Sequence, residues 1–329
     1  MLRKILGSQQ TGLALIILAL GAVLTFFAGT HEDRVTGVAV NNFLNSYTLI
    51  QTATDASFFA VMAVGATIVI ISGGIDLSVG SIYALAGVTM AMVLRGSGSG
   101  GGAGAVLTGL LVCVGVGFLC GLLNGLLVVF LRVHPFIITL GTMWILRGIA
   151  FVSSKAESIL VPESLTTVAK ASLGLGASLY PVPMLTMLAV AALGSVYLTR
   201  TVMGRHVFAF GGHPEASRFS GLCAGLAAFM GASFYGSASC ADATGYELYV
   251  IASAVVGGAS LSGGKGSAIS AMLGAVLIVL IRQSIRTLRF DQNYEWIIVG
   301  CAIIIAVVLD QGSAQLNARR LARAAARES

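Results

Sequence analysis

Long apolar runs alternate with short polar stretches along the whole chain. A helix needs about 20 mostly apolar residues to cross a bilayer, and at least eight of ten apolar segments come near this length or reach it with their flanks, while two or three are short. The pattern therefore predicts an all-α polytopic membrane bundle with about eight to ten transmembrane segments. The ten apolar segments are residues 13–29, 47–72, 81–94, 105–131, 135–152, 182–199, 222–238, 248–262, 268–281 and 296–309.

Composition supports this class of protein. Of the 329 residues, 57% are hydrophobic and only 10% are charged, whereas an ordinary soluble domain has roughly 45–50% and about 25%. The five cysteines lie mostly in apolar runs without a C-x-x-C pair, and the four histidines are scattered without metal-ligand spacing. We therefore expect no disulfide framework, no metal site and no cofactor.

Basic residues predict the orientation of the chain in the membrane. Short loops rich in Lys and Arg stay in the cytoplasm, and the stretch that starts at Arg200, the N-terminus and a basic tail at about residues 311–329 all carry this signal. Both termini are therefore predicted to be cytoplasmic. The stretch RQSIRTLRFDQNYE from Arg282 does not fit, since it falls outside if every segment crosses once. Either one segment is re-entrant or this stretch is an exception to the charge rule.

Two glycine-rich motifs interrupt the apolar pattern in corresponding halves of the chain. GGIDLSVGS at 73–81 and GGASLSGGKGS at 257–267 each follow an apolar run and share the skeleton GGxxLSxG. Unwound backbone at membrane depth is tolerated only where it is buried in protein or lines a cavity, so paired breaks of this kind indicate a transport path. The predicted helix-break glycines are Gly73, Gly74, Gly80, Gly257, Gly258, Gly263 and Gly264.

Asp76 is the most informative residue of the first motif. An ionisable group within a membrane span is costly and is a functional candidate by default. Three roles are open: a cap for the helix that begins SVGSIYALAG, direct contact with a polar solute, or a gating contact. The other candidates for the translocation path or for gating are Ser78, Asn124, Ser260 and Ser262.

Asn124 lies in the run GFLCGLLNG, where glycines recur every four residues. Gly117, Gly121 and Gly125 form a small-residue face on which another helix can pack closely. Asn124 itself is expected to make one interhelical hydrogen bond or to face the path.

The second motif partly matches a phosphate-binding loop, G-x-x-x-x-G-K-[ST]. Ala259 replaces its first glycine and Gly266 replaces the hydroxyl residue that would hold magnesium. We therefore expect no ATPase activity in this chain. A membrane enzyme would also need a clustered nucleophile, base or metal set, and the sequence contains no such catalytic set.

Over nearly its whole length the chain resembles the permease subunits of bacterial ABC sugar importers, in the ribose, arabinose, xylose and autoinducer-2 branch. Four motifs in this order carry the resemblance: GGIDLSVGS at 73–81, GRHVFAFGGHPEASRFSG at 204–221, GYEL at 245–248 and GGASLSGGKGS at 257–267. The resemblance implies one transmembrane permease domain over residues 1–329, in the bacterial inner membrane. The resemblance further implies that this domain imports a monosaccharide or sugar-like solute by alternating access.

The resemblance also implies partners. These are a second permease copy, identical or related, cytoplasmic ATP-binding subunits, a periplasmic solute-binding protein and membrane lipid, with no nucleic acid. The competing hypothesis is an ion-coupled secondary transporter of a small polar solute. Such a transporter needs membrane-buried ionisable groups, and Asp76 stands nearly alone in the predicted spans.

The resemblance implies that a cytoplasmic coupling loop at about residues 200–221 contacts the ATP-binding subunit. The loop's basic, glycine-hinged sequence is also that of an ordinary cytoplasmic loop. The chain departs from the family pattern just after Gly221, where roughly a dozen residues, about half of a span, are missing. The assigned coupling residues are Gly204, Arg205, Gly211, Gly212, Glu215 and Ala216.

Overall fold

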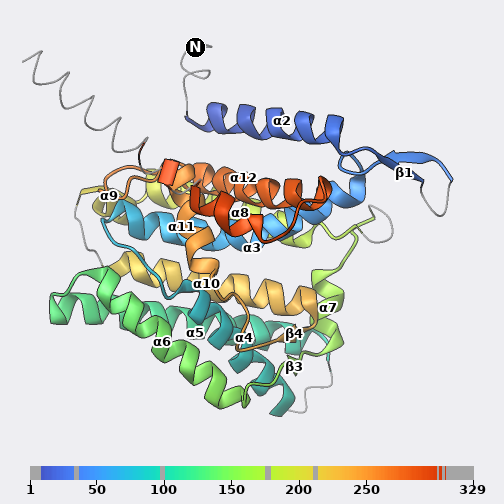
Figure 1. Cartoon of the computed structure of the whole chain (residues 1–329). Helices are drawn as coiled ribbons and strands as arrows, with labels where there is room; N and C mark the ends of the chain where they lie inside the picture. Colours follow the sequence, from blue (N-terminus) through green and yellow to red (C-terminus); the bar gives the residue numbers. More distant parts are fainter. Residues whose placement is uncertain are drawn as a thin grey trace, which may run out of the picture.

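Two layers of helices make up the computed structural model of the chain (Figure 1), which describes residues 9–32, 37–96, 101–174, 179–209 and 214–301 together with 304, 305 and 308. One layer holds α3 (Ser46–Ile71), α8 (Val182–Arg200) and α12 (Ala268–Thr287), and the other holds α4 (Val79–Gly96), α5 (Ala103–Leu131), α6 (Pro135–Ser154) and α10 (Pro214–Tyr235). The short helix α11 (Tyr246–Val256) packs against α3 and α12.

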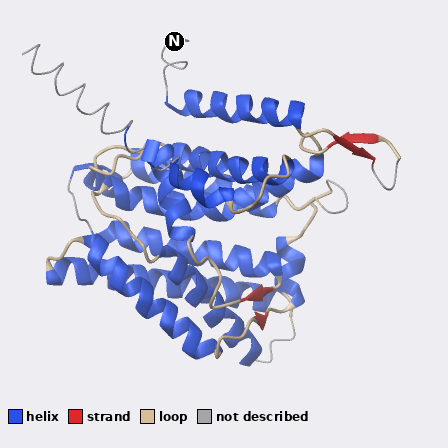
Figure 2. Ribbon diagram, in the orientation of Figure 1, coloured by secondary structure: helices blue, strands red, loops and turns tan. Residues whose placement is uncertain are grey.

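Smaller elements lie around these layers (Figure 2). Helix α2 (Gln9–Phe27) packs on the outside of α12, and α7 (Glu163–Ala169) and α9 (Val202–Ala209) are short. Strands β1 (Thr30–Glu32) and β2 (Ala39–Asn41) form an antiparallel hairpin with Thr30 opposite Asn41. Strands β3 (Ile159–Leu160) and β4 (Ser237–Ala238) form a second antiparallel pair. Helix α9 and the start of α2 lie toward the end of the bundle opposite the β1–β2 hairpin (Figure 1).

Within the described residues, seven helices are long and apolar enough to cross a membrane, namely α2, α3, α4, α5, α6, α8 and α12. The predicted all-α polytopic bundle is thereby confirmed. Helix α10 has 22 residues but is rich in small residues, and α11 has only 11, which at 1.5 Å per residue is about half of a span. The tenth predicted segment is helical over residues 294–301 and only partly described beyond them.

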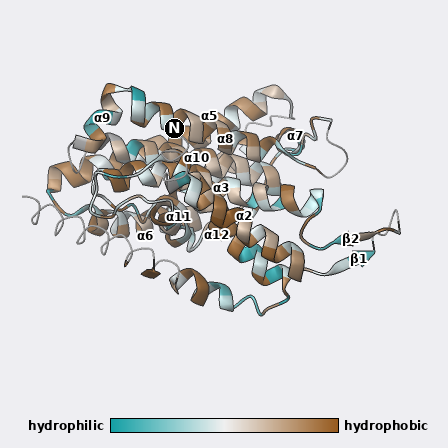
Figure 3. Ribbon diagram, turned by 90° about the horizontal axis from the view of Figure 1, so that it is seen from above, coloured by the Kyte–Doolittle hydropathy of each residue, from teal (hydrophilic) through white to brown (hydrophobic). Residues whose placement is uncertain are grey.

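The distribution of burial suits a helical bundle in lipid. Helix α3 is buried along most of its length, and Ala60, Val61 and Met62 are fully enclosed. The outer helices instead expose large apolar side chains, such as Leu111 on α5 and Leu193 on α8. Figure 3 shows hydrophobic residues along much of the length of the helices. Extensive exposed apolar surface of this kind is typical of a face that contacts lipid.

Helices α5 and α10 approach each other along glycines. A Cβ added to Gly117 or Gly121 would overlap backbone atoms of α10, and one added to Gly221 or Gly225 would overlap backbone atoms of α5. The predicted small-residue packing face is confirmed at Gly117 and Gly121. This close contact fixes α10 against α5 directly beside the site described next.

Helix α10 includes Gly221, after which the chain is expected from its sequence to differ from the family pattern. It runs without interruption from Pro214 to Tyr235, so the end of the predicted coupling loop and the following apolar segment form one helix.

Candidate functional site

The two glycine motifs form the same kind of turn at the ends of α3 and α11. Gly73 (φ 77°) donates its N–H to the Ile70 carbonyl at 2.9 Å, and Gly74 donates to Val69 at 3.0 Å. At α11, Gly258 (φ 88°) donates to the Val255 carbonyl at 2.8 Å. Ala259 then donates to the Ala254 carbonyl at 2.9 Å. This is the Schellman motif, in which a residue in the left-handed conformation follows the helix. The N–H groups at the turn then donate hydrogen bonds to carbonyls of the last helical turn.

The structural register of the two motifs differs by one residue from their sequence register. The shared skeleton pairs Gly73 with Gly257, but the helix ends pair Gly73 with Gly258, because Ser72 and Gly257 are the two C-cap residues. Counted from the helix ends, Asp76 corresponds to Leu261. The shared sequence skeleton and the helix ends therefore align the two motifs differently by one position.

The two breaks contact each other. Gly264 donates its N–H to the carbonyl of Ile71, the last residue of α3, at 2.8 Å. A Cβ added to Gly263 would lie 3.1 Å from that carbonyl oxygen, and one added to Gly266 would lie 2.8 Å from the Ile71 side chain. Glycine is required here because the second motif closely covers the end of α3.

Asp76 is the centre of a buried hydrogen-bond network, hereafter the Asp76 network, which consists of Asp76, Ser78, Asn124 and Ser220. Its Oδ1 accepts from the Ser78 N–H at 2.9 Å and from the Ser78 hydroxyl at 2.6 Å, and its Oδ2 accepts from the Ser220 hydroxyl at 2.7 Å. Asn124 Nδ2 donates to Ser78 Oγ at 2.7 Å. The network thus joins the break before α4 to α5 and α10.

The geometry favours the structural interpretation of Asp76 among the three open at the sequence level. Asp76 is 3% exposed, and both carboxylate oxygens accept hydrogen bonds from the protein. Ser78 precedes the first residue of α4, so Asp76 fixes the start of this helix through the Ser78 N–H. Asn124 makes the expected hydrogen bond from α5, while its Oδ1 has no hydrogen-bond partner among the described residues.

The corresponding residues of the second motif lie apart from this network. Ser260 is buried and its N–H donates to the Lys265 carbonyl at 3.1 Å. Ser262, Gly264 and Lys265 are exposed. The structure therefore brings together Asp76, Ser78 and Asn124 from the predicted set, but neither Ser260 nor Ser262 joins them.

The N-termini of α4 and α11 face each other near the middle of the bundle. A Cβ added to Gly80 would lie 2.5 Å from the Ala243 carbonyl oxygen and 2.6 Å from Glu247 Oε2. Arg147 of α6 holds the loop before α11, since its Nη1 donates to the carbonyls of Cys240 at 2.8 Å and Asp242 at 2.6 Å. Helix N-termini that meet at a break in the membrane are an arrangement that transporters use around a solute path.

The predicted coupling residues lie at the end of the bundle that holds α9. The Thr201 hydroxyl accepts from the Gly204 N–H at 2.9 Å, and a Cβ on Gly204 would overlap the backbone of α8. Arg205 is exposed and Ala216 is buried. Glu215 belongs to α10, but its side chain, like all of Gly211 and Gly212, lies outside the described residues.

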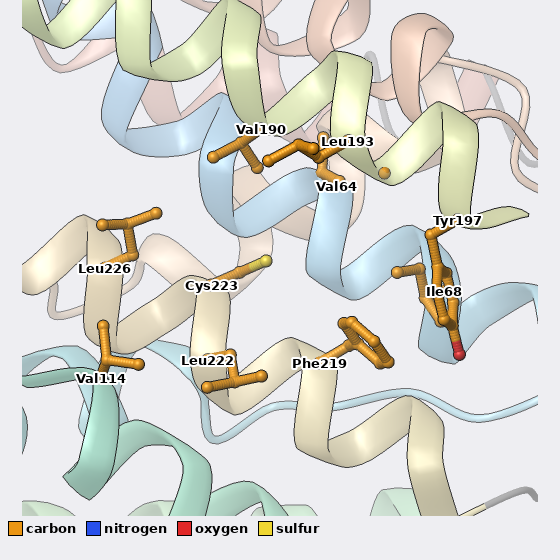
Figure 4. Close-up of a pocket in the computed structure, with 11 residues that line it drawn as sticks. Val64, Ile68, Val114, Val190, Leu193, Tyr197, Phe219, Leu222, Cys223 and Leu226 are labelled. Atoms are coloured by element: carbon orange, nitrogen blue, oxygen red, sulfur yellow. The ribbon is translucent and has the colours of Figure 1, made fainter.

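A cavity of about 240 Å³ lies between α3, α5, α8 and α10 (Figure 4). Val64, Val190, Leu193, Leu222 and Leu226 are among its lining residues, and nearly all of its surface is apolar. A sugar would find almost no hydrogen-bond partner for its hydroxyl groups there. The polar groups around the breaks, and not this cavity, are the candidate path.

Comparison with known proteins decides the family. Residues 48–307 match the family described as branched-chain amino acid transport system / permease component. The chain belongs to this family. The matched part of this permease runs from α3 to residue 307, so it contains both glycine motifs and the whole Asp76 network. No solved structure matches the chain.

Curated relatives of the permease are components of sugar transport systems. It is 34% identical to the D-allose transport system permease protein AlsC of Escherichia coli (strain K12), over 82% of this chain and 85% of that protein. It is 32% identical to the ribose import permease protein RbsC of the same strain, over 82% and 87%. The galactose/methyl galactoside import permease protein MglC is 31% identical over 92% and 94%.

Three residues of the permease site were missed at the sequence level. Arg147 lies inside an apolar segment, and Glu247 lies in the GYEL motif, so each carried a signal that was available. Ser220 carried none, because a serine in a loop-like stretch gives no indication that its hydroxyl reaches a carboxylate 144 residues away.

Proposed function

We propose that the chain is the membrane-spanning permease subunit of an ATP-driven importer, which passes a monosaccharide or sugar-like solute to the cytoplasm. The observation that carries the proposal is the similarity to allose, ribose and galactose permeases over 82% to 92% of the chain, joined to two glycine breaks that contact each other. Broken helices of this kind place backbone groups and helix termini beside a solute path.

In this proposal two permease copies, identical or related, rock against each other while ATP-binding subunits close and open. The solute arrives from a periplasmic binding protein, and the chain does no covalent chemistry itself. It lies in the inner membrane with both termini in the cytoplasm. The position of α9 and the start of α2 at the same end of the bundle supports this orientation (Figure 1).

The coupling segment is proposed to be residues 200–221, with Glu215 in contact with the ATP-binding subunit and the buried Ala216 anchoring the start of α10 to the bundle. Because α10 is continuous, movement at these residues shifts Ser220 and, through its hydrogen bond, Asp76. The break before α4 then moves with the coupling end. The Asp76 network is in this account the mechanical connection between ATP hydrolysis and the path, and not a solute ligand.

The experiment that tests the proposal is gentle solubilisation of the tagged chain followed by identification of bound subunits by mass spectrometry. We expect an ATP-binding subunit to co-purify with the wild-type chain, and Glu215→Arg to abolish its recovery while membrane insertion is unchanged. Glu163→Arg is the matched control, because Glu163 is exposed on α7 at the other end of the bundle. Equal recovery with Glu215→Arg would contradict the coupling assignment.

A further inference from the structure

Arg282, near the C-terminus of α12, is enclosed by aromatic rings. Its guanidinium carbon lies 5.3 Å from the ring centre of Phe59 on α3 and 5.0 Å from that of Tyr249 on α11. Both rings are buried, while the Arg282 side chain is 20% exposed. A cation stacked on two rings is held in place yet keeps access to the surface.

A carboxylate completes the arrangement. Arg282 Nε lies 2.6 Å from Glu295 Oε1, and the Tyr249 hydroxyl donates to the same oxygen at 2.6 Å. Within the described part of the chain, the terminal nitrogens of Arg282 make no hydrogen bond. Arg282 therefore keeps donors, and Glu295 keeps a second oxygen, for a ligand.

Exposed aromatic surface lies directly beside these groups. Trp296 is 61% exposed, its ring centre is 6.1 Å from that of Tyr249, and its ring covers Gly245 at the start of α11. The cluster thus adjoins the opposed N-termini of α4 and α11. We call Phe59, Tyr249, Arg282, Glu295 and Trp296 the Arg282 cluster.

The charges of the region balance. Arg282 faces Glu295, and Arg286 Nη1 lies 3.6 Å from Asp55 Oδ2 on α3, so two cations meet two anions. This pairing accommodates two of the three arginines of the exceptional stretch, and the third, Arg289, is exposed. A site with donors, acceptors and no net charge does not select an ion, whereas a neutral polyol offers hydroxyl groups to the charged pair and C–H faces to the rings.

We propose that the Arg282 cluster is a contact site for a neutral polyhydroxylated solute, with the Arg282–Glu295 pair hydrogen-bonding its hydroxyl groups and Trp296 covering its apolar face. The inference rests on the proposed function and names the part of the path that selects the solute. Nothing in it requires ATP or a partner subunit, so it is tested on the permease alone.

The test uses the full chain in lipid nanodiscs with Trp296 as the reporter. The sequence has two tryptophans, and Trp144→Phe leaves Trp296 as the single fluorophore. D-Allose, D-ribose, anionic D-gluconate and cationic D-glucosamine are titrated in turn. We expect a saturable change in fluorescence with at least one neutral sugar and at least tenfold weaker binding of both ions. A stronger response to either ion, or no saturable response to any sugar, would overturn the proposal.

Two variants separate the proposed role from mere packing. Arg282→Lys keeps the charge but loses the planar fork, so we expect at least tenfold weaker sugar binding, whereas Arg289→Lys, in the same stretch and exposed, leaves binding unchanged. Glu295→Gln keeps the volume and makes the region cationic, so D-gluconate binding rises relative to the neutral sugar. Unchanged preference in Glu295→Gln would contradict the assignment. If sugars cause no change in Trp296 fluorescence while ATP-driven sugar uptake is intact, this inference is rejected and the proposed function is unaffected.

Discussion

The two glycine motifs share a sequence skeleton and the same helix-ending turn, yet they lie in different surroundings. The first passes into the bundle interior, where Asp76 and Ser78 are 3% and 0% exposed and bind two further helices. The second remains at the surface, with Ser262 and Lys265 exposed, and covers the end of α3. A shared motif therefore fixes the turn at a helix end, while the register after the turn decides whether its polar residues are buried.

The largest effect is expected from substitutions at Gly80, where the start of α4 meets the loop before α11. In Gly80→Val the added Cβ alone would lie 2.5 Å from a backbone oxygen, and overpacking costs about 1–3 kcal/mol or more. We expect most of the folded protein to be lost, measured as monodisperse yield in detergent. Gly148→Val on α6 is the control, since an added Cβ there meets nothing within 4 Å. Equal yields would show that the two N-termini are not closely packed.

The second largest effect is expected from removal of the Asp76 carboxylate. Asp76→Ala leaves three buried donors without their acceptor, which costs about 3 kcal/mol. Asp76→Asn keeps an acceptor for Ser78, and the Ser220 hydroxyl can rotate to accept, so about 1 kcal/mol is lost. Thermal unfolding in detergent measures the loss of stability in both variants, and uptake assays compare their transport activity. Near-normal transport by Asp76→Asn would support the structural role, whereas complete loss with intact folding would require the charge itself.

A pair of hydroxyl deletions compares the two surroundings directly. Ser220→Ala removes one hydrogen bond to the buried carboxylate, at a cost of about 2 kcal/mol, whereas Ser262→Ala, at an exposed position, changes stability by less than about 0.5 kcal/mol. Chemical unfolding of the two variants gives the difference. Similar losses would mean that the first motif is no more deeply integrated than the second.

The smallest effect tests the register of the turns. Gly73 and Gly258 both have positive φ, so alanine at either position costs about 1 kcal/mol, and the two losses should agree. Melting temperatures of the two single variants measure this. A clearly larger loss at one position would show that the two helix ends are not equivalent.

Much of the fold could be predicted from the sequence, because long apolar helices leave a direct signal in composition. The predicted bounds of α3 agree with the structure to within one residue, and the predicted start of α12 is that of the structure, although α12 continues six residues beyond its predicted end at residue 281. The small-residue face at Gly117 and Gly121 was also visible, since glycine at every fourth position has few other uses in a span. The apolar segment predicted at 248–262 is shorter in the structure, where α11 has only 11 residues, because the glycines from Gly257 onward end the helix.

The candidate site was less predictable, because its geometry depends on contacts between distant segments. Asp76 and Asn124 were found because polar groups are costly in a membrane, but the burial of Asp76 depends on Ser220, whose position follows from the packing of α10 on α5. Ser260 and Ser262 were candidates from the same motif pattern, but Ser262 is exposed at the surface and Ser260 is buried away from Asp76. Sequence similarity between the two motifs does not predict this difference in surroundings.

ATP-driven uptake by the reconstituted system tests the central claim most directly. The chain is assembled in proteoliposomes with its ATP-binding subunit and binding protein, ATP is enclosed, and accumulation of a labelled neutral sugar is measured without a sodium or proton gradient. The account predicts accumulation that requires ATP and is lost in Glu215→Arg. Accumulation that follows an ion gradient and proceeds without ATP would contradict it and favour an ion-coupled secondary transporter.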